Sequence, residues 1–129
     1  MVRARELRFV LVVDDYEAAT RLYRDVFGLD VVMDLEQDGG RGIILKIPAA
    51  TLELADVEHG GIVDELEVGR RLDDRIRIAV EVDTLESAAV AVTLTGAEPM
   101  AGPVETPWGD RNQRFRAKDG CQLTLFQPS

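Results

Sequence analysis

Residues 13–32 read VDDYEAATRLYRDVFGLDVV, and this stretch decides the fold. It overlaps the end of an apolar run at 7–13, LRFVLVV, which is typical of a short buried strand. Asp14 then predicts a helix N-cap, with a glutamate three residues later as in a capping box. Apolar side chains recur at helical spacing over 16–27, and Gly28 predicts the helix end.

The rest of the chain continues this pattern and then repeats it. In the first half we expect further strands at 29–33, 42–47 and 51–55. The second half predicts a strand, a helix capped at Asp83 and closed at Gly96, and three more strands: 75–82, 85–95, 98–101, 112–117 and 121–126. An offset of 69 residues (77 − 8) relates Arg8 to Arg77, and it also relates the two capping glutamates. An offset preserved over a whole strand–helix unit indicates an internal repeat.

Composition limits the possible partners. The chain of 129 residues is 46% hydrophobic and 30% charged, as expected for one globular domain. A net charge of −9 argues against nucleic acid as a partner, because phosphate binding needs clustered cations. Its apolar runs are too short to span a membrane. The first residues lead into a strand and not into the apolar region of a signal peptide, so we expect a cytoplasmic protein.

Histidine and cysteine are too scarce for most catalytic or metal sites. His59 is the single histidine, and its Glu58 and glycine neighbours indicate an exposed loop. Cys121 is the single cysteine, so no intrachain disulfide can form, and its apolar surroundings favour a buried thiol over a nucleophile. We therefore expect no serine or cysteine to have a histidine available as a base, and a zinc site would lack its usual ligands.

Three stretches in order resemble the vicinal oxygen chelate superfamily, which contains glyoxalases, bleomycin-resistance proteins and extradiol dioxygenases. They are residues 13–32, residues 78–88 (IAVEVDTLESA) and residues 105–127 with their Pro-Trp-Gly and Asp-Gly turns. The resemblance implies an α+β fold of two βαβββ modules in a pseudo-two-fold repeat, each sheet curled as a half-barrel around a cavity. We expect module one at 6–56, module two at 75–127, and a homodimer that covers exposed sheet edges.

The segment 57–74 is then a linker between the modules, with or without a short helical turn. Its acidic and basic residues, among them Asp64, Glu65, Arg70 and Arg71, predict a solvated, charged surface.

In metal-using members of the superfamily, ligands lie on the first and last strand of each module. The positions that match in this sequence are Arg8, Glu53, Arg77 and Thr124. Arginine offers no lone pair and threonine is a poor ligand, so we expect no metal and no cofactor. Two interpretations remain open: an arginine pairs with Glu53 to fill the old metal site, or a guanidinium is free to bind a ligand.

The closing hairpin adds two further candidates. With a three-residue turn at 118–120, Arg114 lies across from Thr124, whereas a two-residue turn would place Phe115 there. The resemblance favours the longer turn, and so Arg114. Trp108, in the preceding loop, is either a lid that stacks on a flat ligand or a hydrophobic plug.

The leading hypothesis is a metal-free protein that binds a small molecule in the cavity, as bleomycin-resistance proteins do. Arg8, Arg77 and Arg114 against a single identified carboxylate, Glu53, predict an anionic or carbonyl-rich ligand. The alternatives are a superfamily enzyme (lyase, isomerase or dioxygenase) with an atypical site, such as metal-free acid–base chemistry at Glu53 or Glu81, and a metal-dependent enzyme with an unusual ligand set. A purely structural module is also open.

Overall fold

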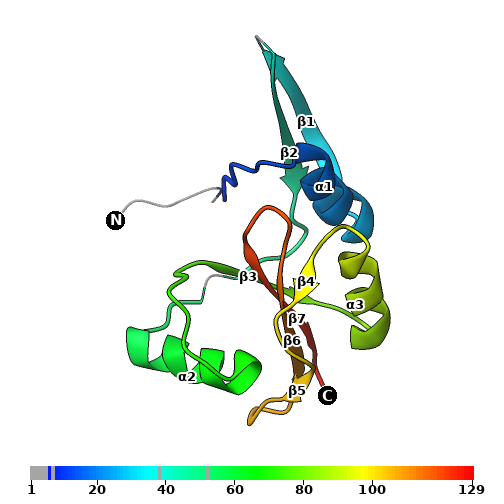
Figure 1. Ribbon diagram of the computed structural model, residues 1–129. Coiled ribbons are helices and arrows are strands. Elements are labelled where there is room, and N and C mark those ends of the chain that lie inside the picture. The colour runs from blue at the N-terminus through cyan, green and yellow to red at the C-terminus, as the bar shows by residue number, and fades with distance from the viewer. Residues whose placement is uncertain (1–5, 7, 38, 52) are drawn as a thin grey trace.

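The computed structural model describes the whole chain except residues 1–5, 7, 38 and 52. Two parts separate clearly in Figure 1: a hairpin at one end and a mixed sheet with its helices at the other. The hairpin pairs β1 (Asp30–Gln37) with β2 (Gly40–Lys46) in antiparallel register. The predicted α+β class is confirmed, but the described strands do not close into a barrel.

The second part is a five-stranded sheet in the order β3-β7-β6-β4, with β5 also paired to β6. Its strands are β3 (Arg77–Glu81), β4 (Glu98–Pro99), β5 (Val104–Glu105), β6 (Arg111–Arg116) and β7 (Gln122–Gln127). β3 runs parallel to β7, and β6 pairs antiparallel with β7, β4 and β5. The β6–β7 register places Arg114 opposite Thr124, so the three-residue turn is correct and Phe115 faces the other side.

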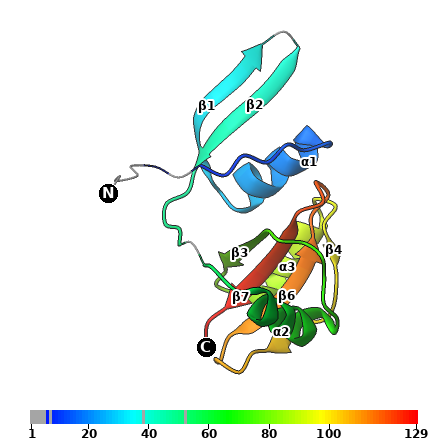
Figure 2. The ribbon, with the colours of Figure 1, turned by 90° about the vertical axis from the view of Figure 1, so that its left-hand side faces the viewer.

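One face of this sheet carries the apolar core, because side chains alternate between the two faces of a strand. Helix α3 (Leu85–Thr93) covers that face in Figure 2. The core cluster draws on β6, β7, α3 and the first helix: Leu22, Leu85, Val92, Ala97, Phe115, Ala117, Leu123 and Leu125. Asp83 does not cap α3 as predicted: Thr84 occupies the N-cap position without a side-chain bond, and the Leu85 amide donates instead to Gln127 Oε1 at 2.8 Å.

The first predicted helix is present, but it changes character midway. It starts as α1 (Tyr16–Thr20) and continues as a π-helix, η1 (Arg21–Val26). Its N-cap is Asp15 and not Asp14, because the Asp15 carboxylate accepts the Ala18 amide at 2.9 Å. Gly28, with φ of 68°, follows the helix as expected, since this left-handed conformation suits glycine.

Two strands predicted for the first half do not form. Residues 8–13 and the described residues of 51–55 lie outside any strand, while Leu7 and Leu52 fall outside the described residues. Val12 is 95% exposed and Leu54 is 86% exposed. A strand forms only when its backbone N–H and C=O groups bond to a neighbouring strand. Residues 8–13 and the described residues of 51–55 have no such neighbour in the structure. The second half therefore forms every helix and strand predicted for it, whereas in the described first half only the helix and the hairpin form, so the predicted two-module repeat is not confirmed.

The linker contains a full helix, α2 (Val57–Val68), where at most a short turn was expected. Two glycines inside it lower helix propensity, which is why the sequence pattern underrates it. Asp56 caps its start by accepting the amide of His59, so His59 lies in a helix and not in a loop. Gly69 ends it with φ of 77°. Neither α2 nor any other helix in the described part of the chain has the length and apolar character to span a membrane.

Candidate functional site

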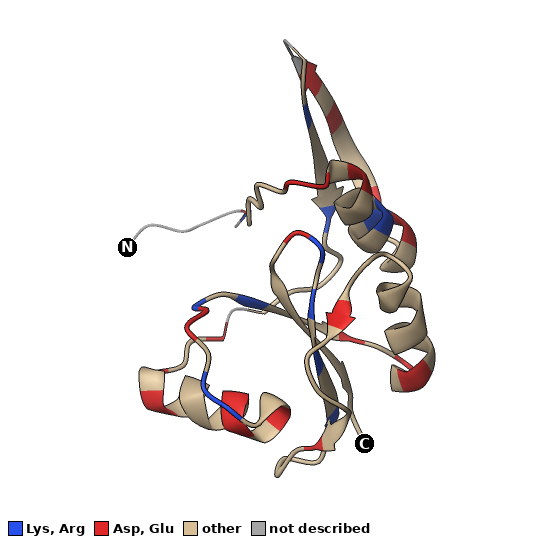
Figure 3. Ribbon diagram, viewed as in Figure 1, with Lys and Arg blue, Asp and Glu red and all other residues tan. Residues whose placement is uncertain are grey.

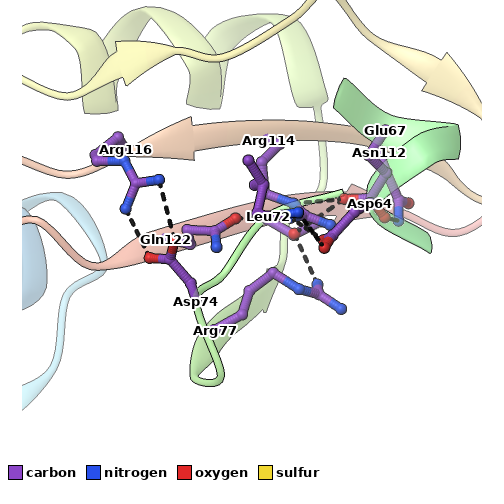
Figure 4. A network of polar contacts seen from close by, with 10 residues as sticks. Asp64, Glu67, Leu72, Asp74, Arg77, Asn112, Arg114, Arg116 and Gln122 are labelled. Atoms are coloured by element: carbon purple, nitrogen blue, oxygen red, sulfur yellow. Dashed lines mark hydrogen bonds and ion pairs between the residues drawn. The ribbon is translucent and has the colours of Figure 1, made fainter. Parts of the chain in front are cut away.

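The opposite face of the sheet is polar and lies under α2. β6 contributes Arg114, whose side chain is 0% exposed in the centre of this face. Its Nη1 donates to Asp64 Oδ1 at 2.9 Å and to Gln122 Oε1 at 2.6 Å, and its Nε donates to Glu67 Oε1 at 2.9 Å. Figure 4 shows these side chains converging from α2, β6 and β7. Since a buried charge is tolerated only with partners, two carboxylates of α2 stabilise this guanidinium.

Glu67 is the second buried charge of the network. Its side chain is 1% exposed, and besides Arg114 it accepts hydrogen bonds from Asn112 Nδ2 at 3.0 Å and Thr124 Oγ1 at 3.2 Å. Three donors therefore converge on one carboxylate at the point where α2 meets the sheet.

Arg77 on β3 lies next to this pair. Its Nη1 donates to Thr124 Oγ1 at 2.7 Å, so hydrogen bonds run from Arg77 through Thr124 to Glu67. Burial lowers the pKa of Arg77 from its usual value, and repulsion by Arg114 lowers it further, while Glu67, Glu53 and Asp64 act in the opposite direction. An arginine keeps its charge under such a shift. Two neighbouring guanidinium groups therefore share one polar face.

Two buried polar atoms of this network have no hydrogen-bond partner among the described residues. They are Arg114 Nη2 and Asn112 Oδ1. Buried polar groups are nearly always satisfied in folded proteins, and each exception asks for a bound group or a water. The open N–H donors on a buried guanidinium suit an acceptor such as a carbonyl or carboxylate oxygen.

The six predicted site residues separate into two groups. Arg77, Arg114 and Thr124 lie together on the polar face. Glu53 is exposed and makes no hydrogen bond or ion pair with the polar face among the described contacts, although it acts to raise the pKa of Arg77. Arg8 belongs to no sheet and pairs with Glu6 at 2.7 Å, so the structure does not place it with Arg77 as expected. Trp108 is 53% exposed in the loop after β5.

The residues that sequence reasoning missed are Asp64, Glu67, Asn112 and Gln122. Asp64 was expected on a solvated surface, but its side chain is only 15% exposed because it faces Arg114. The spacing of Asp64 and Glu67 is a signal that could have been used. Residues three apart on a helix share a face, so this pair of acids can contact one arginine on the neighbouring sheet.

These residues do not fit a metal ion. At the positions that the resemblance assigns to ligands, Arg77 hydrogen-bonds Thr124, and the nearest buried carboxylate, Glu67, is engaged by Arg114. In the described part of the chain no three His, Cys, Asp or Glu side chains gather as a possible metal site.

Two open depressions of the surface lie away from the polar face, which α2 covers (Figure 2). One, of about 300 Å³, lies between η1 and α3 and is lined by residues such as Phe27, Val82 and Ala88. The other, of about 170 Å³, lies between α1 and the hairpin. Neither of these depressions is the enclosed cavity that was expected between two modules, so that cavity is not confirmed among the described residues.

Comparisons with known proteins agree with the fold. The family model described as Glyoxalase/Bleomycin resistance protein/Dioxygenase superfamily matches residues 7–125. No curated protein sequence matches the chain. Among solved structures, a member of that superfamily from Sphaerobacter thermophilus DSM 20745 is similar, with a TM-score of 0.56 and 25% identity over 94% of this chain and 98% of the other.

Two further structures carry names that refer to antibiotics. TnmS3, an antibiotic binding protein from Streptomyces sp. CB03234, has a TM-score of 0.60 and 24% identity over 100% of this chain and 99% of its own. FosX, a fosfomycin resistance protein from Listeria monocytogenes, has a TM-score of 0.57 and 14% identity over 100% and 96%. At these identities the similarity concerns the fold.

Proposed function

This chain belongs to the Glyoxalase/Bleomycin resistance protein/Dioxygenase superfamily, and within it we propose a metal-free protein that binds a small molecule. The proposed site is the polar face of the second sheet, with Arg77, Arg114 and Thr124 as binding residues. One observation carries the proposal: Arg114 is fully buried yet leaves Nη2 without a partner among the described residues. A ligand with carboxylate, phosphonate or carbonyl oxygens would complete that guanidinium.

The arginines of this face have more carboxylate partners than the sequence indicated. The sequence identified only Glu53 as a carboxylate partner for the arginines, but Asp64 and Glu67 also face Arg114. Two arginines and two buried or half-buried carboxylates balance one another while α2 covers the sheet. The preference for acceptor-rich ligands therefore rests on hydrogen-bond donors, and not on an excess of positive charge.

Related folds support a binding role without fixing it. TnmS3 is named as an antibiotic binding protein, and its name refers to no reaction. A chain of similar fold and length therefore supports a binding role here. We propose the same class of function here, and we describe the ligand only by its chemistry, as a small molecule with acceptor oxygens.

The enzymatic alternative finds less support. Glu53 and Glu81, the carboxylates expected to act as bases, are both exposed and do not lie in a site that excludes water. Glu67 is buried, but Arg114 and two further donors occupy it. A general base needs a free lone pair within reach of the substrate.

We further propose that the protein is a homodimer in the cytoplasm, built from modules 6–56 and 75–127. Large apolar side chains are exposed throughout the first module, among them Phe9, Val10, Val12, Val32, Met33 and Leu54. Exposed apolar side chains in such number favour a cover, and pairing with a second copy would also give residues 8–13 and 51–55 their strand partners. The free Cys121 suits a reducing compartment.

A thermal-shift panel tests the binding site. It contains carboxylates, phosphates, phosphonates and cationic glycopeptide drugs, applied to the wild type, Arg77→Ala and Arg111→Ala. Arg111 lies on the same sheet but pairs with Glu86 at the surface, so its variant is the matched control. We expect acceptor-rich compounds to raise the Tm of the wild type and of Arg111→Ala, and not that of Arg77→Ala. Stabilisation by the cationic drugs alone, or equal shifts in all three proteins, would contradict the proposal.

A further inference from the structure

Helix α2 lies on the face where the ligand is proposed to bind, and its acids occupy the donors that a ligand would use. We propose that α2 is a built-in, displaceable occupant of this site: Asp64 and Glu67 stand in for an anionic ligand on Arg114, and such a ligand binds by displacing the helix. This inference rests on the proposed function, because it concerns the same site.

The first support is the chemistry of the contact. Arg114 Nε and Nη1, Asn112 Nδ2 and Thr124 Oγ1 all converge on the two carboxylates of α2, within 3.2 Å. Such a set of donors around carboxylate oxygens is what a carboxylate or phosphonate ligand requires. The unpaired Arg114 Nη2 shows that α2 satisfies this site incompletely.

The second support is that α2 is held by charges more than by apolar packing. Only Gly61, Val63 and Glu67 of the helix are buried. Its larger apolar residues, Ile62 and Leu66, remain 45% and 39% exposed. A helix docked for stability alone normally turns such residues toward the core. Contacts made chiefly by ion pairs can be exchanged for the ion pairs of a ligand.

The third support is the way α2 is attached. Arg71, which follows the helix, pairs with two glutamates of α2: Glu65 at 2.6 Å and Glu58 at 2.9 Å. Residues 58–71 therefore form a unit that can move together. The described residues of the preceding segment, 47–56, form no strand and are exposed, so they add little to hold the helix on the sheet. At the other end, Gly69 adopts a left-handed turn after which the chain leaves the helix.

The test compares three isosteric variants of α2 that each remove one negative charge: Glu67→Gln, Asp64→Asn and, as the matched control, Glu65→Gln. Glu65 is on the same helix but contacts Arg71 at the surface. The probes are benzoate, phenylphosphonate and inorganic phosphate, at constant ionic strength. Removing an internal competitor raises apparent affinity, and if α2 covers the site in at least about nine of ten molecules the gain is at least about tenfold. We expect this gain for Glu67→Gln and Asp64→Asn, and none for Glu65→Gln.

Hydrogen exchange supplies an independent readout on the wild-type protein. A bound probe should speed exchange of the α2 amides and slow exchange of the β6 and β7 amides, because the helix leaves while the sheet gains a ligand. If Glu67→Gln does not fold, Asp64→Asn still decides the affinity comparison, since the Gln122 contact to Arg114 remains.

The possible failures are distinguishable. If a probe binds the wild type through Arg77 while α2 exchange is unchanged, and neither Glu67→Gln nor Asp64→Asn binds more tightly than Glu65→Gln, the proposed function stands and the displacement model is overturned. If no compound of the binding panel stabilises the wild type through Arg77, the proposed function fails. The displacement model is then also overturned unless Glu67→Gln or Asp64→Asn gains binding over the control.

Discussion

Separating Arg114 from Glu67 should lower the free energy of unfolding more than most other substitutions on the polar face. Replacing Arg114 by methionine keeps much of the volume but leaves Glu67, 1% exposed, with only the neutral donors of Asn112 and Thr124. An uncompensated buried charge typically costs about 3–5 kcal/mol of unfolding free energy. The converse change, Glu67→Leu, should cost less, about 3 kcal/mol or below, because Asp64 still faces Arg114.

The double variant is the decisive member of the series. With both charges gone, the penalty of an isolated charge at Glu67 disappears. The remaining cost comes from Asn112 and Thr124, which lose an acceptor, and from Asp64, which loses its ion-pair partner. We expect the double variant to be less destabilised than the sum of the single variants by about 2 kcal/mol.

Urea denaturation measures all three values. For a slope of about 1.5–2 kcal/mol per molar, a loss of 3 kcal/mol lowers the midpoint by about 1.5–2 M. Arg111→Met, which breaks the exposed pair with Glu86, should cost less than about 1 kcal/mol and serves as the control. Single variants that lose no more than this control, or effects that simply add, would refute the reasoning that the pair is desolvated and coupled.

Three further outcomes are expected. Gly69→Ala should lower stability by about 1 kcal/mol, because φ is 77° at this position. Gly61→Ala should be close to neutral, because the atoms nearest to the added Cβ belong to the movable guanidinium of Arg71. Tm measurements on the two variants test this difference. The hydrogen bond from the Ala18 amide lowers the pKa of Asp15. The stabilisation by this cap is therefore present above the unfolded pKa and is lost as pH falls through the lower folded pKa. The Tm difference between wild type and Asp15→Ala should shrink below about pH 4. Chelators should leave Tm unchanged and elemental analysis should find no stoichiometric metal, a result that tight zinc, nickel or iron binding would contradict.

The second half could be predicted from the sequence because its signals are local. The turn length correctly places Arg114 opposite Thr124, and side-chain alternation along the predicted strand 121–126 explains why Leu123 and Leu125 face the core. Both follow from the pleat and from hairpin geometry, which depend on neighbouring residues.

The parts that could not be predicted depend on distant partners. Residues 8–13 have the composition of a strand, but a strand forms only where another backbone lies beside it. Helix α2 was hidden for the opposite reason: its glycines and charges indicate a solvated linker, and nothing local reveals that Asp64 and Glu67 meet an arginine almost 50 residues later. The sequence separation is 50 for the first pair and 47 for the second.

The position of β7 also has a consequence for biosynthesis. It is the final strand in chain order, yet it lies between β3 and β6 in the sheet. A ribosome must therefore deliver β7 before β3 has any neighbour, and until then the apolar face of α3 has no finished sheet to cover. Residues paired across this junction, such as Ile78 and Leu123, are 45 positions apart (123 − 78). We expect nascent chains that stop short of β7 to remain unfolded and to engage chaperones, and the sheet to assemble only after synthesis has reached its last strand.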